Sequence, residues 1–278
     1  MNISFIGGGN MARAIIGGLK NNGFNMASIT VIDPDAQKRA QLATEFHVQT
    51  SNIYIENSNT DAIVLAVKPQ QLQEVCTQLS PKISTQLVIS IAAGIRSQDI
   101  SRWLGNYQAI VRVMPNTPAQ IQAGVSALYA KPSVSLTQRE QATTILAAAG
   151  LTLWLDDEAK MDAVTAISGS GPAYVFYFIE ALTDAAINLG LTPEEARLLA
   201  LQTFTGASLL ASHSTEDVKT LRAQVTSKGG TTEQGILALE AANIKAAMMS
   251  AAKAAANKSR ALGDDLAGAG NLGASNAG

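Results

Sequence analysis

Residues 3–19 read Ile-Ser-Phe-Ile-Gly-Gly-Gly-Asn-Met-Ala-Arg-Ala-Ile-Ile-Gly-Gly-Leu, and this stretch decides the fold. A short apolar run, residues 3–6, ends in three glycines, and an apolar pattern of helical period follows. Gly7, Gly9 and Ala12 have the spacing G-x-G-x-x-G/A of a dinucleotide-binding turn. Gly7 permits the turn, Gly9 lets the backbone approach a pyrophosphate, and Ala12 lets the helix pack closely on the strand. A glycine-rich turn of an ordinary α/β protein has the same pattern, so the motif needs support from the rest of the chain.

The composition limits the class of protein. A chain of 278 residues suits two domains, and 47% hydrophobic residues favour large cores and a buried subunit interface. The net charge of −2, with no basic run, argues against nucleic acid or an anionic membrane as a partner. Cys76 is the only cysteine, and neither a signal peptide nor an apolar run of about 18 residues is found. We therefore expect a cytoplasmic protein, and we predict no metal site.

Strand patterns alternate with helical patterns through the first half of the chain. Strands are predicted at 3–6, 28–32, 62–67, 86–91, 110–114, 124–129 and 151–155, and helices at 36–46, 70–79, 97–104 and 138–149. This alternation predicts an α/β domain, residues 1–157, with a Rossmann-type doubly wound parallel sheet. Ligands bind at the carboxyl ends of such strands, so the segments that follow the strands are expected to converge on one crevice. These segments are 7–11, Asp33, Lys68-Pro69, Ala93-Gly94 and Asn116.

Asp33 lies directly after the second predicted strand, where a dinucleotide fold places its ribose-binding acid. A carboxylate at this position favours the 2′-hydroxyl of NAD and repels the 2′-phosphate of NADP. The alternative is an aspartate that serves only the turn, or the N-cap of the following helix. Asn52 is a candidate adenosine contact.

From residue 158 the pattern is helical throughout, with helices predicted at 173–189, 193–212, 216–223, 232–242 and 244–262. We assign residues 158–262 to an all-α helical dimerisation domain and residues 263–278, mostly Gly, Ala and Asn, to a flexible tail. The helix at 173–189 is apolar on nearly every face, so a second subunit is expected to cover it. Thr192 is predicted to cap the next helix, with Pro193 in its first turn.

The segment Val225-Thr-Ser-Lys-Gly-Gly-Thr-Thr-Glu-Gln234 precedes and opens another helix. Thr231 and Gln234 have the spacing of a capping box. Glycines, hydroxyl groups and a lysine at a helix start suit a small carboxylate. A well-capped helix with a flexible approach is the alternative.

Six blocks of sequence, in this order, resemble the pyrroline-5-carboxylate reductase family. They are Phe5–Ala12, Ala66–Pro69, Ser90–Gly94, Arg112–Pro118, Ser168–Tyr174 and Val225–Thr232. The resemblance implies reduction of 1-pyrroline-5-carboxylate to L-proline with NADPH or NADH, the last step of proline biosynthesis. It also implies an N-terminal Rossmann domain and a helical domain that interlocks with a partner, in a homodimer that is often the building block of a decamer.

The resemblance implies roles for individual residues. Cofactor contacts are expected at Gly7, Gly8, Gly9, Asn10, Met11, Asp33, Pro34, Asn52, Ala66, Val67, Lys68, Pro69, Ala92, Ala93, Gly94 and Asn116. Substrate contacts are expected at Ser227, Gly229, Gly230, Thr231 and Thr232. Two features depart from the family pattern. Lys228 stands where many members have Pro, and Asp33-Pro34 stands where many have a polar or basic pair, which leaves the preference between NADPH and NADH open.

The implied reaction explains why the chain needs no catalytic histidine. A cyclic imine can arrive already protonated, so the protein has to align it, hold its carboxylate and exclude water. Thr232 is the candidate hydrogen-bond partner of the substrate nitrogen. The two histidines, His47 and His213, lie in patterns typical of a helix surface or a helix end.

Two other classes of function remain open. The 3-hydroxyacid dehydrogenases of the 6-phosphogluconate type share this plan of domains and use a lysine as acid and base. Lys160, Lys219 and Lys245 are the candidates, and none lies in the glycine-rich lysine motif of that family. A nucleotide-sensing scaffold would bind NAD(P) without turnover.

Overall fold

The computed structural model describes residues 1–54 and 59–272. The chain forms two compact units. The first contains residues 1–54, 59–170 and 254–272, and the second contains residues 171–253. This division differs from the predicted boundary between residues 157 and 158, because residues 158–170 and the end of the chain belong with the sheet.

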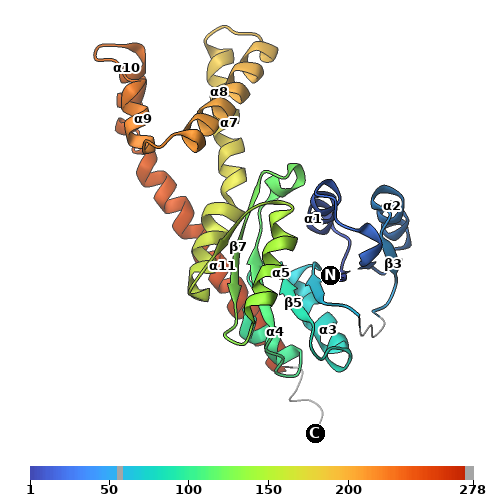
Figure 1. The fold of residues 1–278 in the computed structure, drawn as a ribbon. Helices are drawn as coiled ribbons and strands as arrows, with labels where there is room; N and C mark the ends of the chain where they lie inside the picture. The colour runs from blue at the N-terminus through green and yellow to red at the C-terminus, as the bar shows by residue number, and fades with distance from the viewer. Residues whose placement is uncertain (55–58, 273–278) are drawn as a thin grey trace. The chain divides into compact units, whose positions relative to one another are not determined.

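The first unit is built on one eight-stranded sheet (Figure 1). Its strands are β1 (Ile3–Ile6), β2 (Ile29–Ile32), β3 (Gln49–Ser51), β4 (Ala62–Leu65), β5 (Leu87–Ser90), β6 (Ile110–Met114), β7 (Gly124–Ala130) and β8 (Gly150–Trp154). The order is β3-β2-β1-β4-β5-β6-β7-β8, with neighbours parallel except for β6 and β7. The doubly wound α/β sheet is therefore confirmed, with a reversal in direction that the sequence pattern did not predict.

Helices cover both faces of the sheet and form two apolar clusters. On one face lie α1 (Asn10–Asn21), α2 (Ala36–Phe46) and α5 (Leu136–Ala147), whose cluster includes Ile15, Leu42 and Leu146. The other cluster is formed by α3 (Pro69–Leu79) and α4 (Ser97–Trp103), through Leu72, Cys76 and Ile100. Strands β1, β4 and β5 are buried along their whole length, as expected of parallel strands covered on both faces.

Two features of the sheet were missed for physical reasons. Strand β3, Gln49-Thr50-Ser51, is a short polar strand at the edge and has no apolar pattern to reveal it. Strand β7 runs antiparallel to β6 because the two are joined only by a short link containing the 3₁₀ turn Thr117–Ile121. A parallel crossover needs about a dozen residues or more, so the length of this link was the usable signal.

The second unit consists of α7 (Gly171–Asn188), α8 (Pro193–His213), α9 (Val218–Gln224), α10 (Thr231–Ala241) and the first part of α11 (Ile244–Leu272). The predicted cap of α8 is confirmed, with Thr192 and Glu195 forming a reciprocal capping box and Pro193 in the first turn. On α7, Phe176 and Tyr177 are 65% and 69% exposed in the single chain. Among the described residues, no helix combines the length and the apolar character needed to cross a bilayer.

The prediction for the end of the chain is wrong in part. Helix α11 does not stop at Leu262 but continues to Leu272, and its later residues pack on the first unit. Leu266 contacts the cluster of α3 and α4, and Asp264 pairs with Arg96. Alanine and leucine sustain a helix through Gly263, so the glycine content misled the prediction. The last six residues of the proposed tail, 273–278, lie outside the described residues.

Candidate functional site

The glycine turn after β1 is closed tightly by the neighbouring strands. Gly7 has φ +101°, and its N–H donates to the carbonyl oxygen of Ile32 at 2.7 Å. A Cβ atom on Gly7 would lie 2.8 Å from the carbonyl oxygen of Ala66, whereas one on Gly9 would meet nothing within 4 Å. Gly9 caps α1 without a side-chain hydrogen bond, so the helix start is open to a ligand. This cradle fits the pyrophosphate of a dinucleotide.

A cavity of about 510 Å³ adjoins the glycine turn. Its lining includes nine of the residues predicted to contact a cofactor. They are Gly7, Gly8, Gly9, Asp33, Pro34, Asn52, Ala66, Val67 and Lys68. Residues that follow β1, β2, β3 and β4 thus meet at one place, as expected at the carboxyl ends of parallel strands.

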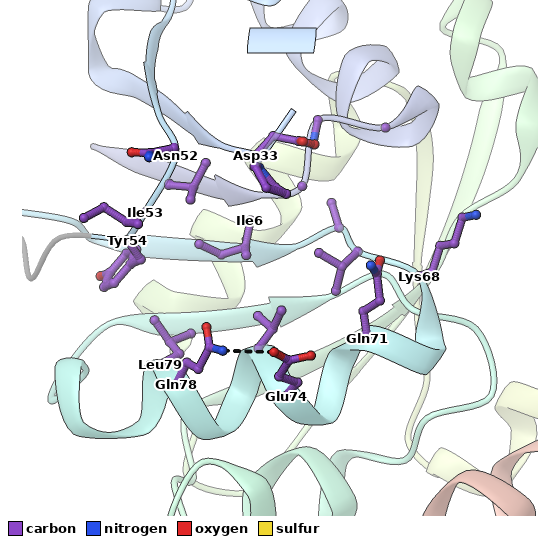
Figure 2. Close-up of a pocket in the computed structure, with 18 of the residues that line it drawn as sticks. Ile6, Asp33, Asn52, Ile53, Tyr54, Lys68, Gln71, Glu74, Gln78 and Leu79 are labelled. Atoms are coloured by element: carbon purple, nitrogen blue, oxygen red, sulfur yellow. Dashed lines mark hydrogen bonds between the residues drawn. The ribbon is translucent and has the colours of Figure 1, made fainter. Parts of the chain in front are cut away.

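The rest of the cavity wall was not predicted. One face of α3 contributes Gln71, Val75 and Gln78, and Tyr54 lies across from this helix (Figure 2). Gln78 donates from Nε2 to Oε1 of Glu74 at 3.2 Å. The signal was available in the sequence, because Gln71, Val75, Gln78 and Lys82 recur at helical spacing and line one stripe.

Asp33 is buried, with 6% of its surface exposed. Its Oδ2 accepts the N–H of Gly8 at 2.8 Å, and its Oδ1 accepts the N–H of Asp35 at 2.9 Å. The N-cap of α2 is Asp35, which accepts from the N–H groups of Gln37 and Lys38. Asp33 therefore serves the turn, and the N-cap of α2 is its neighbour Asp35. The predicted contact of Asp33 with the ribose stays a prediction.

Seven predicted cofactor residues do not line the cavity: Asn10, Met11, Pro69, Ala92, Ala93, Gly94 and Asn116. Asn10 borders a separate hollow of about 310 Å³, and Met11 packs against the core of the sheet. Pro69 begins α3. Residues 92–94 follow β5, and Asn116 follows β6, so both lie at the same edge of the sheet as the cavity.

The turn after β5 and the start of α4 are each held by a distant part of the chain. A Cβ on Gly263 of α11 would lie 2.7 Å from the carbonyl oxygen of Gly94, which has φ +80°. Beyond this turn, at the start of α4, Glu158 accepts the backbone N–H of Ser97 at 2.7 Å and a hydrogen bond from the buried Arg112 at 2.9 Å. The carboxylate of Glu158 therefore caps α4 from a distant part of the chain. Sequence reasoning missed this connection because the three residues are far apart in the chain.

Asn116 is fixed by the structure around it. Its Oδ1 accepts the N–H of Val125 at 2.9 Å, and its Nδ2 donates to the hydroxyl of Ser168 at 3.3 Å. Ser168 lies in a π-helical turn, Thr165–Gly169. Turns of this kind are frequent at functional sites. The two hydrogen bonds fix the Asn116 side chain two residues after the end of β6.

The second candidate helix start, that of α10, lies in the second unit. Gly230 is the N-cap and the helix begins at Thr231, one residue earlier than predicted. The predicted capping box of Thr231 and Gln234 is wrong, because no side chain caps this helix within the part of the chain described. Instead Glu233 accepts the N–H of Gly229, which has φ +73°. Glycine supplies this turn, and both threonine side chains are left exposed.

Comparison with known proteins identifies the family to which the chain belongs. The family model "Pyrroline-5-carboxylate reductase dimerisation" matches residues 158–262, and the model "NADP oxidoreductase coenzyme F420-dependent" matches residues 2–94. A pyrroline-5-carboxylate reductase of Pseudomonas aeruginosa is 46% identical over 266 residues, covering 95% of this chain and 97% of the relative. The chain belongs to the pyrroline-5-carboxylate reductase family. It is therefore an NAD(P)-dependent oxidoreductase.

Solved structures of the family agree with this assignment. A pyrroline-5-carboxylate reductase from Coxiella burnetii has a TM-score of 0.90 at 43% identity, covering 94% of this chain and 98% of that one. One from Plasmodium falciparum, with NADP bound, has a TM-score of 0.83 at 31% identity and covers 95% and 98%. The resemblance seen in the six sequence blocks is confirmed at the level of the family and of its fold.

Neither histidine lines the cavity beside the glycine turn. His47 follows α2 in a left-handed conformation, and His213 is the last residue of α8, with its Nδ1 2.8 Å from the carbonyl oxygen of Leu209. Both lie at helix ends, as the sequence pattern predicted. In the first unit and the second, over the residues described, no group of three or more His, Cys, Asp or Glu side chains forms a metal site.

Proposed function

We propose that this protein reduces 1-pyrroline-5-carboxylate to L-proline with hydride from NADPH or NADH, as its family membership implies. The observation that carries the proposal is the pair of helix starts at Gly9 and Gly230. Each begins at an extended glycine, and each lacks a side-chain cap within the described residues. Uncapped N–H groups and the helix dipole attract an anion at both places.

The first helix start supports a role in holding the cofactor. The Gly7–Gly9 backbone would hold the pyrophosphate, and the cavity beside it would hold the adenosine. Ala66–Pro69, Ala92–Gly94 and Asn116 would position the remainder of the dinucleotide along the edge of the sheet. Bound NAD(P)H supplies the hydride.

The second helix start supports a role in holding the substrate. Ser227, Gly229, Gly230 and Thr231 would hold the carboxylate through the helix start, and the Thr232 hydroxyl would accept a hydrogen bond from the N–H of the protonated imine. Because the imine arrives protonated, orientation and exclusion of water are the tasks left to these residues. A histidine acid is not needed, which agrees with His47 and His213 lying at helix ends.

The substitution Thr232→Ala tests the role of the hydroxyl. We expect kcat/KM for pyrroline-5-carboxylate to fall about 10²-fold if the bond strengthens in the transition state, while the affinity for NADPH is unchanged. Steady-state kinetics and fluorescence titration with NADPH measure the two quantities. Thr232→Ser is the matched control, because it keeps the hydroxyl and is expected to retain most of the activity. Normal turnover in the alanine variant would reject the assignment.

We also propose that a homodimer is the building block of the assembly, and that five dimers form a decamer. The match to a dimerisation domain and the exposed aromatic residues of α7 support this proposal. Light scattering is expected to give ten times the mass of one chain, and a mass of one chain would reject both statements. A cytoplasmic location is proposed on the same family grounds.

A further inference from the structure

The carboxylate of Asp33 is already engaged inside the protein. Both of its oxygens accept backbone N–H groups, from Gly8 at 2.8 Å and from Asp35 at 2.9 Å, and the side chain is buried. A carboxylate held in this way organises the glycine turn, and about two of its roughly four acceptor positions are already occupied by the protein backbone. The usual reason for an aspartate after β2 to select NADH is therefore weakened here.

Two cations follow Asp33 at the start of α2, and they differ in freedom. Arg39 donates from Nη1 to the carbonyl oxygens of Asp33 and Pro34, at 2.7 Å and 2.9 Å, and so holds the turn. Lys38 lines the cavity. Its ammonium group is 3.9 Å from the carboxylate of Asp35, with both side chains about half exposed, which is a weak pair. Lys38 is thus available to a ligand at little cost in lost contacts.

Two further lysines, Lys68 and Lys82, line the same cavity, but neither lies on the helix that follows β2. Lys68 immediately precedes α3, beside the glycine turn. Lys82 donates from Nζ to the carbonyl oxygen of Tyr54 at 3.1 Å. The ribose 2′ position of a dinucleotide lies at the end of β2, where a nearby cation accommodates a 2′-phosphate. Lys38 is the lysine on the helix that directly follows this strand.

We propose that Lys38 recognises the 2′-phosphate of NADPH, and that Asp33 organises the glycine turn without selecting between the two cofactors. The inference rests on the proposed function in one respect only, namely that the protein uses NADPH as a cofactor. The carboxylate of Asp35 lies 3.9 Å from the Lys38 ammonium group, so removal of the Lys38 charge would leave Asp35 unbalanced beside the phosphate. The phosphate itself carries about −1.5 to −2 at neutral pH.

Binding of two small probes tests the inference without catalysis. Adenosine 2′,5′-bisphosphate carries the 2′-phosphate, and adenosine 5′-monophosphate lacks it, so the ratio of their dissociation constants isolates this one group. Calorimetric titration of the assembled Lys38→Gln variant is expected to show about a tenfold or greater loss of affinity for the bisphosphate, with the monophosphate unchanged. Lys38→Arg is expected to keep the preference, because it keeps the charge.

Lys82→Gln is the matched control, since Lys82 lines the same cavity. We expect it to change the affinity for both probes alike. The inference is overturned if the ratio is unchanged in Lys38→Gln, or if Lys82→Gln removes the preference instead. A protein that failed to reduce pyrroline-5-carboxylate but lost the bisphosphate preference in Lys38→Gln would support this inference and reject the proposed function, so the two failures are distinguishable.

Discussion

The glycine turn at residues 7–9 and the glycine turn at residues 229–230 both open a helix, yet their surroundings differ. Around the first, strands β2 and β4 close on Gly7 so tightly that a Cβ atom would lie 2.8 Å from Ala66. Around the second, Gly229 has a similar positive φ, but a Cβ atom would meet nothing within 4 Å. The first turn is part of a packed sheet edge, whereas the second is exposed in the single chain.

One chain is enough to build the surroundings of the first glycine turn, whereas the surroundings of the second turn need another chain to become enclosed. The first unit supplies the cradle, the cavity beside it and the contacts that fix both. The second unit supplies a helix start whose Thr231 and Thr232 side chains are exposed. In a family with a dimerisation domain, a partner surface is the expected means of enclosing such a site.

The largest effect is expected at the closed turn. Gly7→Ala places a Cβ atom against the backbone of Ala66 at a positive φ, so we expect a loss of about 2–4 kcal/mol in the free energy of unfolding, and loss of NADPH binding. Thermal unfolding at one fixed protein concentration measures the first, and fluorescence titration measures the second. A variant as stable as the parent would show that the turn is not closed by β4.

Gly9→Ala is the matched control for this prediction. Gly9 has φ −73° and its Cβ position is open, so the variant is expected to lose only the small preference of an N-cap for glycine over alanine, less than Gly7→Ala loses. The added methyl group faces the space where the backbone should approach a pyrophosphate, so NADPH affinity is expected to fall. Loss of binding in both variants, with a large loss of stability only in Gly7→Ala, would distinguish the role of Gly9 from that of Gly7.

A smaller effect is expected at the open turn. Gly229→Ala meets no neighbour in the single chain and suffers only the cost of a left-handed residue, about 1–2 kcal/mol. Thermal unfolding of the assembled protein, compared with Gly7→Ala at the same concentration, measures it. A loss as large as that of Gly7→Ala would show that a second chain packs on this turn, which sharpens the contrast between the two sites.

The smallest effect concerns a helix start that is capped within its own unit. Hydrogen bonds from the backbone N–H and the side chain of Thr220 lower the pKa of the exposed Asp217 below its ordinary value. A carboxyl group whose pKa is lowered on folding stabilises the fold above its unfolded pKa of about 3.9, and this contribution disappears as the pH falls through the folded value. We expect Asp217→Ala to lower the melting temperature slightly at pH 7, and we expect this difference to shrink as the pH falls below about 4. A difference that stays constant or grows as the pH falls would contradict a role for the charged carboxylate in the cap.

Local patterns were sufficient for most of the fold. The predicted strands before Gly7 and Asp33 end at the same residues, Ile6 and Ile32, as the strands of the structure. The cap at Thr192 followed from its hydroxyl group and from Pro193. Each of these signals lies within a few residues of the structure it determines. Sequence reasoning failed where the deciding contact is distant or the pattern is polar, as at β3 and at the Glu158 carboxylate that caps α4.

At the candidate site, too, some features were predicted from the sequence and others were found only in the structure. The glycines and Asp33 were found from spacing alone, and the cavity confirms that they lie together. The two hydrogen bonds from backbone N–H groups to the Asp33 carboxylate could not be predicted from the sequence. An aspartate after β2 gives the same sequence pattern whether it binds a ribose or holds the turn. The capping box expected at Thr231 failed because Gly230 provides an extended cap one residue earlier.

The packing of Gly263 against Gly94 has a consequence for how the protein is made. The first unit is discontinuous in the chain, because residues 254–272 belong to it. These residues leave the ribosome only after the entire second unit has been synthesised. The turn after β5 therefore waits for α11 before its surroundings are complete, and a nascent chain that stops before α11 would carry all eight strands but leave Gly94 without its packing partner.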